Sequence, residues 1–143
     1  LTQWVMNLGD DTITEAQKDD LPAEFPRVHP ELDGNKHRYG YCLGTGSMVK
    51  PDFGRFVKYD FVEDSREIFE LPTHESGAEP VFIPSVNARS EDEGYLISFV
   101  YDKSTNGSSV QILNAQQISE GPIAKVLLPQ RVPYGFHGSW LPA

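Results

Sequence analysis

Proline and glycine recur along the whole chain and limit the length of any regular element. The 143 residues include 11 prolines and 12 glycines, which divide the sequence into short segments. No stretch longer than about ten residues keeps the i, i+3, i+4, i+7 spacing of apolar residues that marks an amphipathic helix. Several segments instead alternate with a period of two, as half-buried strands do. We therefore expect an all-β chain.

The expected strands are short and evenly spaced. The clearest unit is a hairpin, in which residues 94–101 and 109–113 flank a turn containing Asn106-Gly107, a pair that readily adopts positive φ. Further strands are expected at residues 4–8, 38–43, 55–61, 67–71, 80–83 and 123–128, with a short helical turn at residues 114–118. Roughly ten or eleven strands at this spacing are typical of sandwiches, barrels and propellers, and the pattern alone does not choose among them.

The net charge and the cysteine content limit which classes of partner and which cellular compartment we expect. Asp and Glu outnumber Lys and Arg by 21 to 12, which gives a net charge of −9. Such a surface repels phosphates, so it argues against nucleic acid and against a polybasic membrane anchor. The single cysteine, Cys42, can form no disulfide within the chain, which favours a reducing, cytoplasmic compartment. We expect Cys42 to be a small core residue, and the acidic segments at residues 10–11 and 18–20 to be solvated loops.

The four histidines fall into two groups. His29, His37 and His74 lie among polar and turn residues, and we expect them to be exposed loop histidines. No two of them have the spacing of a metal-binding pair. His137 differs, because prolines, glycines and aromatic residues surround it within residues 128–140. That setting suits a histidine held rigidly in an apolar pocket, either as a packed core residue or as a metal ligand.

Three segments resemble those of one known family. The run Leu-Pro-Gln-Arg-Val-Pro-Tyr-Gly-Phe-His-Gly at residues 128–138 resembles the C-terminal signature of the carotenoid cleavage oxygenases, a family that includes lignostilbene dioxygenases and the retinal pigment epithelium isomerase. Residues 24–27, Glu-Phe-Pro-Arg, resemble its Glu-Phe-Pro segment, and residues 79–82, Glu-Pro-Val-Phe, resemble its Glu-Pro-x-Phe segment. The segments occur in the family's order, although the family more often has Asp where Asn114 stands.

The resemblance implies a seven-bladed β-propeller with Fe(II) on its axis, held by four histidines. The chain would be the C-terminal part, about three blades of one propeller domain without separate domains of its own. His137 would be the last iron ligand, and the other three would lie upstream of Leu1. Glu79 would orient His137, and Glu24 would orient a histidine outside the chain. A neutral histidine binds a metal through one nitrogen and donates its other N–H to a carboxylate, so these residue types suit that arrangement.

Other side chains near these motifs have less defined roles. The aromatic residues could line a hydrophobic tunnel for a conjugated substrate, and the alternative is that each packs in a blade core. These residues are Phe25, Phe82, Tyr134 and Phe136. Glu75 is expected to be an exposed loop carboxylate without a role, and Arg131 could be a buried structural cation.

The resemblance also implies an activity for the whole protein. A non-haem Fe(II) dioxygenase would cleave a C=C bond of a carotenoid, an apocarotenoid or a stilbene-type substrate with O₂ and give two carbonyl products. The alternatives are a retinoid-type isomerohydrolase on the same iron site and a non-catalytic propeller module that has lost its iron. Any peripheral contact with a membrane would come from parts outside this chain. The 143 residues alone, with one of the four ligands, are expected to be inactive.

Overall fold

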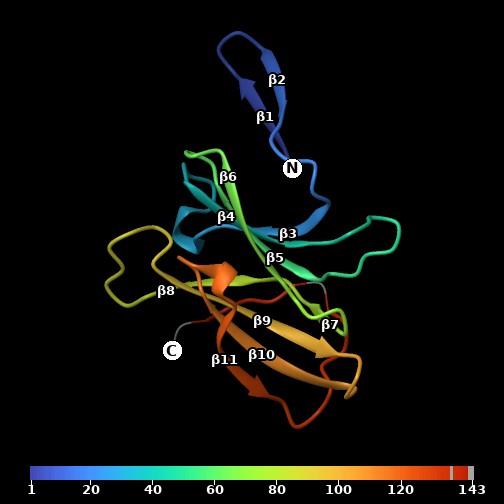
Figure 1. Ribbon diagram of the computed structural model, residues 1–143. Coiled ribbons are helices and arrows are strands. Elements are labelled where there is room, and N and C mark those ends of the chain that lie inside the picture. Colours follow the sequence, from blue (N-terminus) through green and yellow to red (C-terminus); the bar gives the residue numbers. More distant parts are fainter. Residues whose placement is uncertain (136, 142–143) are drawn as a thin grey trace.

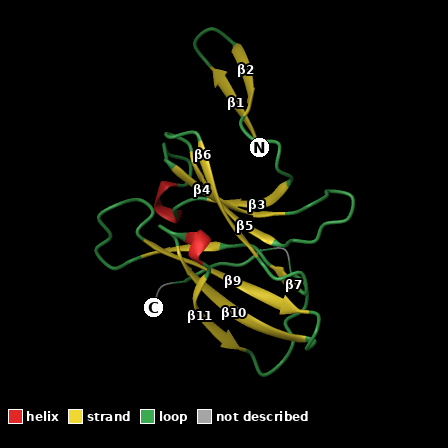
Figure 2. Cartoon of the chain, in the orientation of Figure 1, coloured by secondary structure: helices red, strands yellow, loops and turns green. Residues whose placement is uncertain are grey.

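The computed structural model describes residues 1–135 and 137–141, and these residues form an all-β structure. Eleven strands and two single turns of 3₁₀ helix, η1 (Pro30–Leu32) and η2 (Ile118–Glu120), make up its regular elements (Figure 2). The all-β prediction is therefore confirmed. None of the helices in the described residues is long and apolar enough to cross a membrane.

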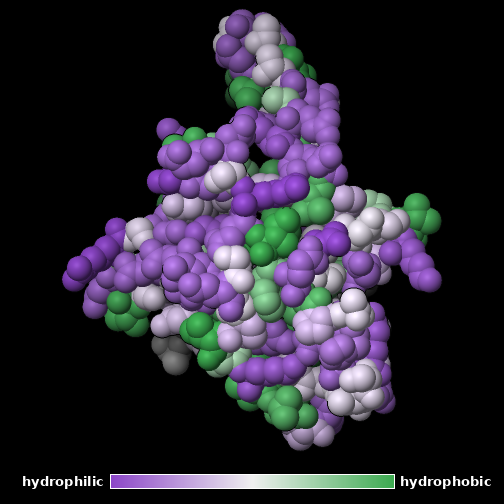
Figure 3. All heavy atoms as spheres, viewed as in Figure 1, coloured by the Kyte–Doolittle hydropathy of each residue, from purple (hydrophilic) through white to green (hydrophobic). Residues whose placement is uncertain are grey.

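The first two strands form a hairpin that stands away from the rest of the chain (Figure 1). β1 (Thr2–Asn7) pairs antiparallel with β2 (Thr12–Gln17). The register places Trp4 and Met6 on the same face as Ile13, and all three side chains are more than half exposed. Figure 3 shows mostly hydrophilic residues on this face of the molecule, with some hydrophobic ones on the hairpin.

A four-stranded antiparallel sheet follows the hairpin. Its strands are β3 (Ala23–Arg27), β4 (Tyr39–Gly44), β5 (Arg55–Asp60) and β6 (Ser65–Glu70), in the order β3-β4-β5-β6. The last three agree with strands predicted from the sequence, and β3 was missed. The pairing of β3 with β4 shifts register between Glu24 and Arg27, and Phe25 adopts a φ of 57° there. Such a bulge bends a strand and re-aims its side chains.

The second sheet has five strands and lies below the first in Figure 1. It contains β7 (Glu75–Gly77), β8 (Val81–Pro84), β9 (Gly94–Asp102), β10 (Gly107–Asn114) and β11 (Pro122–Leu127). The order is β11-β10-β9-β7, and β8 also pairs with β9. The predicted β9–β10 hairpin is present, and Asn106 in its turn has a φ of 51°. The estimate of about three blades for the chain stays a prediction.

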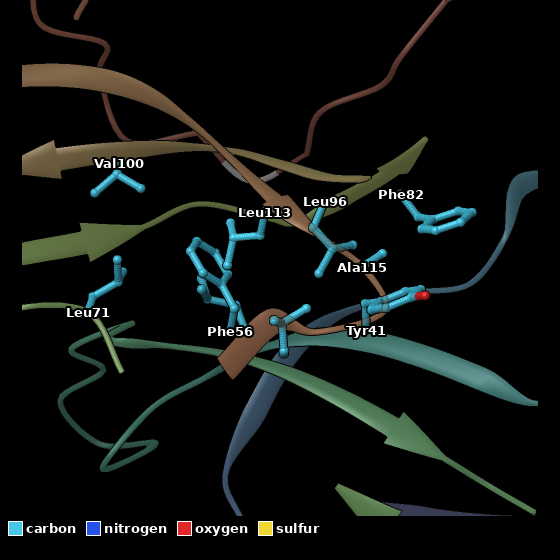
Figure 4. Close-up of a cluster of buried hydrophobic side chains, with 10 residues drawn as sticks. Tyr41, Phe56, Leu71, Phe82, Leu96, Val100, Leu113 and Ala115 are labelled. Carbon is cyan, nitrogen blue, oxygen red and sulfur yellow. The ribbon is translucent and has the colours of Figure 1, made fainter. Parts of the chain in front are cut away.

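The main core lies between the two sheets (Figure 4). Tyr41 and Phe56 from the first sheet pack with Leu96 and Leu113 from the second, and all four are almost fully buried. Burying a large apolar side chain contributes roughly 1.5–3 kcal/mol to folding. Cys42 lies in a smaller cluster and is buried, as expected, and this burial raises the pKa of its thiol to about 12. The main cluster contains Phe82 of β8 and packs against Phe25 of β3, so it links these two strands.

Asp19 does not lie in a solvated loop. Its side chain is 10% exposed, accepts a hydrogen bond from the Tyr59 hydroxyl at 2.6 Å and pairs with Arg66. Burial alone would raise the pKa of Asp19, but the hydrogen bonds from Tyr59 and Arg66 outweigh it and hold that pKa well below its usual range. The neighbouring Asp20 and the other acidic pair, Asp10 and Asp11, are exposed as expected.

Replacing Tyr59 by phenylalanine tests how much its hydrogen bond to Asp19 contributes to stability. The variant Tyr59→Phe removes the hydroxyl donor and leaves Arg66 as the partner of Asp19, so we expect a loss of about 1 kcal/mol in the free energy of unfolding. Chemical denaturation of the full-length variant would measure the loss. A free energy of unfolding equal to that of the wild type would show that the Tyr59 hydroxyl does not stabilise the fold.

Candidate functional site

His137 and Glu79 meet because the segment after β11 returns to the β7–β8 connection, which carries Glu79. The Nδ1 atom of His137 lies 3.3 Å from Oε1 of Glu79. The histidine side chain is 74% exposed, whereas that of Glu79 is 5% exposed. The expectation of an apolar pocket around His137 is wrong for the described residues. One aromatic ring, that of Phe25, lies edge-on to the imidazole at 5.7 Å between ring centroids.

The Glu79 carboxylate is held on both oxygens. Its Oε2 atom accepts hydrogen bonds from Nη2 of Arg27 at 2.8 Å and from the backbone N–H of Gly138 at 2.7 Å. Burial alone would raise the pKa of Glu79, but the bonds from Arg27, Gly138 and His137 outweigh it and lower that pKa below its usual value. The carboxylate is therefore ionised and fixed in place at neutral pH.

The contact selects one tautomer of a neutral His137. An ionised carboxylate can only accept a hydrogen bond, so in the neutral imidazole Nδ1 carries the proton and Nε2 keeps its lone pair. No described residue makes a hydrogen bond to Nε2, and the ring is exposed. A neutral imidazole backed by a carboxylate suits a ferrous ion or a similar transition metal. The described residues thus fit one ligand of a metal site.

Glu24 stands apart from this pair. It lies half-buried in β3, where its backbone pairs with Leu43, and no histidine among the described residues contacts its carboxylate. Its expected partner lies outside this chain. The role of Glu24 therefore stays a prediction.

The four aromatic residues proposed for a tunnel occupy different environments. Phe82 is buried in the main core, with its ring stacked on Tyr41 at 5.2 Å between centroids. Phe25 is half-buried beside His137, Tyr134 is exposed, and Phe136 lies outside the described residues. Among the described members, Phe25 is the one that contacts His137. A tunnel lined by these side chains stays a prediction.

Two of the three remaining histidines are less exposed than expected. His29 is half-buried, with its ring 5.3 Å from that of Phe82, and His37 is half-buried, with its ring 5.7 Å from that of Phe61. The prediction of exposed loop histidines is wrong for these two, because aromatic side chains from other segments cover them. His74 is exposed as predicted.

Glu75 is not an exposed loop carboxylate. It is buried at the start of β7 and bound by Lys125 at 2.6 Å and Gln111 at 2.9 Å. Ligand atoms of His74, Glu75 and Asp102 lie within 4.8 Å of one another, which is the spacing of a metal-binding group. The Lys125 ammonium already neutralises Glu75 there, so a metal ion would have to displace it.

Arg131 is not a buried cation. It lies exposed in the C-terminal segment, where its guanidinium carbon stands 4.8 Å from the ring centre of Tyr101 and 5.5 Å from that of Tyr134. Such cation–π contacts at exposed sites contribute about 0.5–1 kcal/mol. Arg131 therefore fastens part of the C-terminal segment to β9. In the described residues it makes no contact with His137.

Sequence analysis missed Arg27, which contacts both Glu79 and Gly138. It stands directly after the Glu-Phe-Pro run, so its place in that motif was the available signal. Its partners lie 52 and 111 residues further along the chain, and no local pattern links them to it.

Comparison with known proteins gives one consistent set of relatives. A family model described as retinal pigment epithelial membrane protein matches residues 1–142. A carotenoid cleavage oxygenase of Mycobacterium tuberculosis is 35% identical over 147 residues, which cover 99% of this chain and 29% of that protein. A carotenoid 9,10(9',10')-cleavage dioxygenase 1 of Pisum sativum is 37% identical over 140 residues, which cover 86% of this chain and 26% of that protein.

A solved structure shows the same fold. The cobalt-substituted apocarotenoid oxygenase of Synechocystis superposes with a TM-score of 0.93 at 26% sequence identity, and the match covers 99% of this chain and 30% of that chain. The chain thus spans less than a third of the length of the relatives described here.

Proposed function

Because the chain belongs to the family of the retinal pigment epithelial membrane protein and the carotenoid cleavage oxygenases, and forms part of its seven-bladed propeller, we propose an oxidative cleavage activity for the full-length protein. It would be a non-haem Fe(II) dioxygenase that cleaves one C=C bond of a carotenoid or apocarotenoid. Both oxygen atoms of O₂ enter the products, and each carbon of the broken double bond becomes a carbonyl carbon. The names of the relatives support the carotenoid class over the stilbene class.

One observation in this chain carries the proposal, namely the pair of His137 and Glu79. The buried, ionised carboxylate accepts a hydrogen bond from Nδ1–H of His137, so the neutral imidazole would present the lone pair of Nε2 to a metal. Bound ferrous iron would bind and activate O₂, and the double bond itself would supply the electrons that reduce O₂. The exposed His137 ring leaves that face of the chain open to ligands from the rest of the protein. Phe25, against the same ring, offers an apolar contact for a conjugated substrate.

Iron quantification and a substrate panel on the full-length protein test the proposal. We expect stoichiometric iron, loss of the polyene absorbance band with a carotenoid or apocarotenoid, and two carbonyl products for each O₂ consumed. Cleavage of a stilbene with no carotenoid turnover would contradict the proposed substrate class. A protein that binds no iron would instead be a non-catalytic module, and ester conversion without O₂ uptake would indicate an isomerohydrolase. The cytoplasmic location is part of the same proposal, and cell fractionation would test it.

A further inference from the structure

Arg27 joins three segments of the chain that are distant in sequence. Its Nη2 atom donates to Oε2 of Glu79 at 2.8 Å and to the backbone carbonyl of Gly138 at 2.5 Å. The backbone N–H of Gly138 donates in turn to the same carboxylate oxygen at 2.7 Å. One guanidinium nitrogen and one carboxylate oxygen therefore bind both backbone polar groups of the residue that follows His137.

The burial of this pair makes it stronger than an ordinary surface ion pair. The Glu79 side chain is 5% exposed and that of Arg27 is 35% exposed, so water competes weakly for the carboxylate. Hydrogen bonds between charged partners are roughly twice as strong as those between neutral ones. Without Arg27, Oε2 of the buried Glu79 would keep only the Gly138 N–H as a donor, so the carboxylate would be held less firmly.

The local backbone conformation explains why the end of β3 reaches Glu79 and Gly138. The register shift between Glu24 and Arg27, with a φ of 57° at Phe25, bends the strand just before Arg27. Phe25 and Arg27 are two residues apart and both contact the C-terminal segment. Phe25 touches the imidazole of His137, and Arg27 binds the main chain beside it. The bulge thus aims two neighbouring side chains at one histidine.

We propose that Arg27 is a positioning residue for the metal ligand His137. It fixes the Glu79 carboxylate and the peptide groups of Gly138, and so sets the orientation of the imidazole and the tautomer that leaves Nε2 free. The inference rests on the proposed function, because it concerns the same metal site. Two effects of removing Arg27 oppose each other. A looser carboxylate weakens metal binding, whereas the loss of a nearby positive charge strengthens it, so the direction of the change distinguishes positioning from simple electrostatics.

Cobalt titration of the metal-free, full-length protein tests this role. We expect Arg27→Ala to weaken Co(II) binding by about 10-fold, at the lower end of the usual effect of losing a residue that orients a ligand. Arg27→Lys should recover most of the affinity, because it keeps a charged donor. Arg55→Ala is the matched control, since it removes an arginine from β5, two strands away from β3 in the same sheet, where Arg55 pairs with the 62% exposed Glu70. That control should bind Co(II) as the wild type does.

The outcomes separate this inference from the proposed function. An Arg27→Ala protein that is folded by circular dichroism and binds Co(II) as tightly as the wild type, or more tightly, overturns the positioning role. If the wild type binds no Co(II), the proposed function fails. Hydrogen exchange at the Gly138 amide then tests separately whether Arg27 holds the C-terminal segment in place. Faster exchange in Arg27→Ala than in Arg55→Ala would support its hold on the segment, and equal exchange would overturn it.

Discussion

Replacing His137 by alanine is expected to remove the metal and abolish cleavage in the full-length protein while the fold survives. In the described residues the imidazole lies outside both core clusters, so its loss leaves the packing between the two sheets intact. The same substitution removes Nε2, the nitrogen that would donate its lone pair to the metal, from the ring that Glu79 orients. Bound metal and turnover should therefore fall to background, while circular dichroism and the unfolding midpoint of the metal-free variant match those of the metal-free wild type.

His74→Ala provides the matched control for this prediction. His74 is also exposed, and it belongs to the group with Glu75 and Asp102 that has the spacing of a metal site. Because Lys125 already neutralises Glu75, we expect His74→Ala to keep its metal and its activity. Loss of metal in His74→Ala with retention in His137→Ala would move the metal site to that group. Full metal and full turnover in His137→Ala would make His137 a structural residue.

The sequence was sufficient for the fold class and for most of the strands. Proline and glycine cut the chain into pieces too short for helices, and the Asn106-Gly107 turn marked the β9–β10 hairpin. Three strands were missed for identifiable reasons. β2 is rich in threonine and has little apolar alternation, β3 is bulged at Phe25, and β7 has three residues. A pattern with a period of two does not extend through such segments.

The candidate site was only partly predictable, because its partners come together over long separations. The family-like motifs pointed to Glu79 and His137, and the structure brings these two into contact across 58 residues. Arg27 is tied to them by bonds that no local spacing indicates. Glu75 was misjudged for the same reason. It is buried by a lysine 50 residues away, so composition around it gave the wrong environment.

Replacing Glu79 by glutamine should disable the site although size and shape are preserved. The carboxylate uses Oε2 to accept from two donors, Arg27 and Gly138, and Oε1 to accept from Nδ1 of His137. A glutamine has one accepting oxygen and one donating NH₂ group. If the oxygen faces Arg27, the NH₂ group faces Nδ1 and favours the tautomer that protonates Nε2, the nitrogen proposed to bind the metal. If the NH₂ group faces Arg27, it meets two donors and leaves the guanidinium without its charged partner.

Both orientations of the amide are unfavourable, so we expect Glu79→Gln to lose about 10–100-fold in metal affinity or kcat. Glu63→Gln is the appropriate control, because the Glu63 side chain is 67% exposed and makes only a 3.7 Å contact with Arg38. Glu75→Gln would be a poor control, since Glu75 is itself buried and bound by Lys125 and Gln111. Parallel Co(II) titrations and steady-state kinetics on the two full-length variants would decide the matter. Equal values for Glu79→Gln and Glu63→Gln would exclude Glu79 as the residue that orients the ligand, while His137 could still bind the metal.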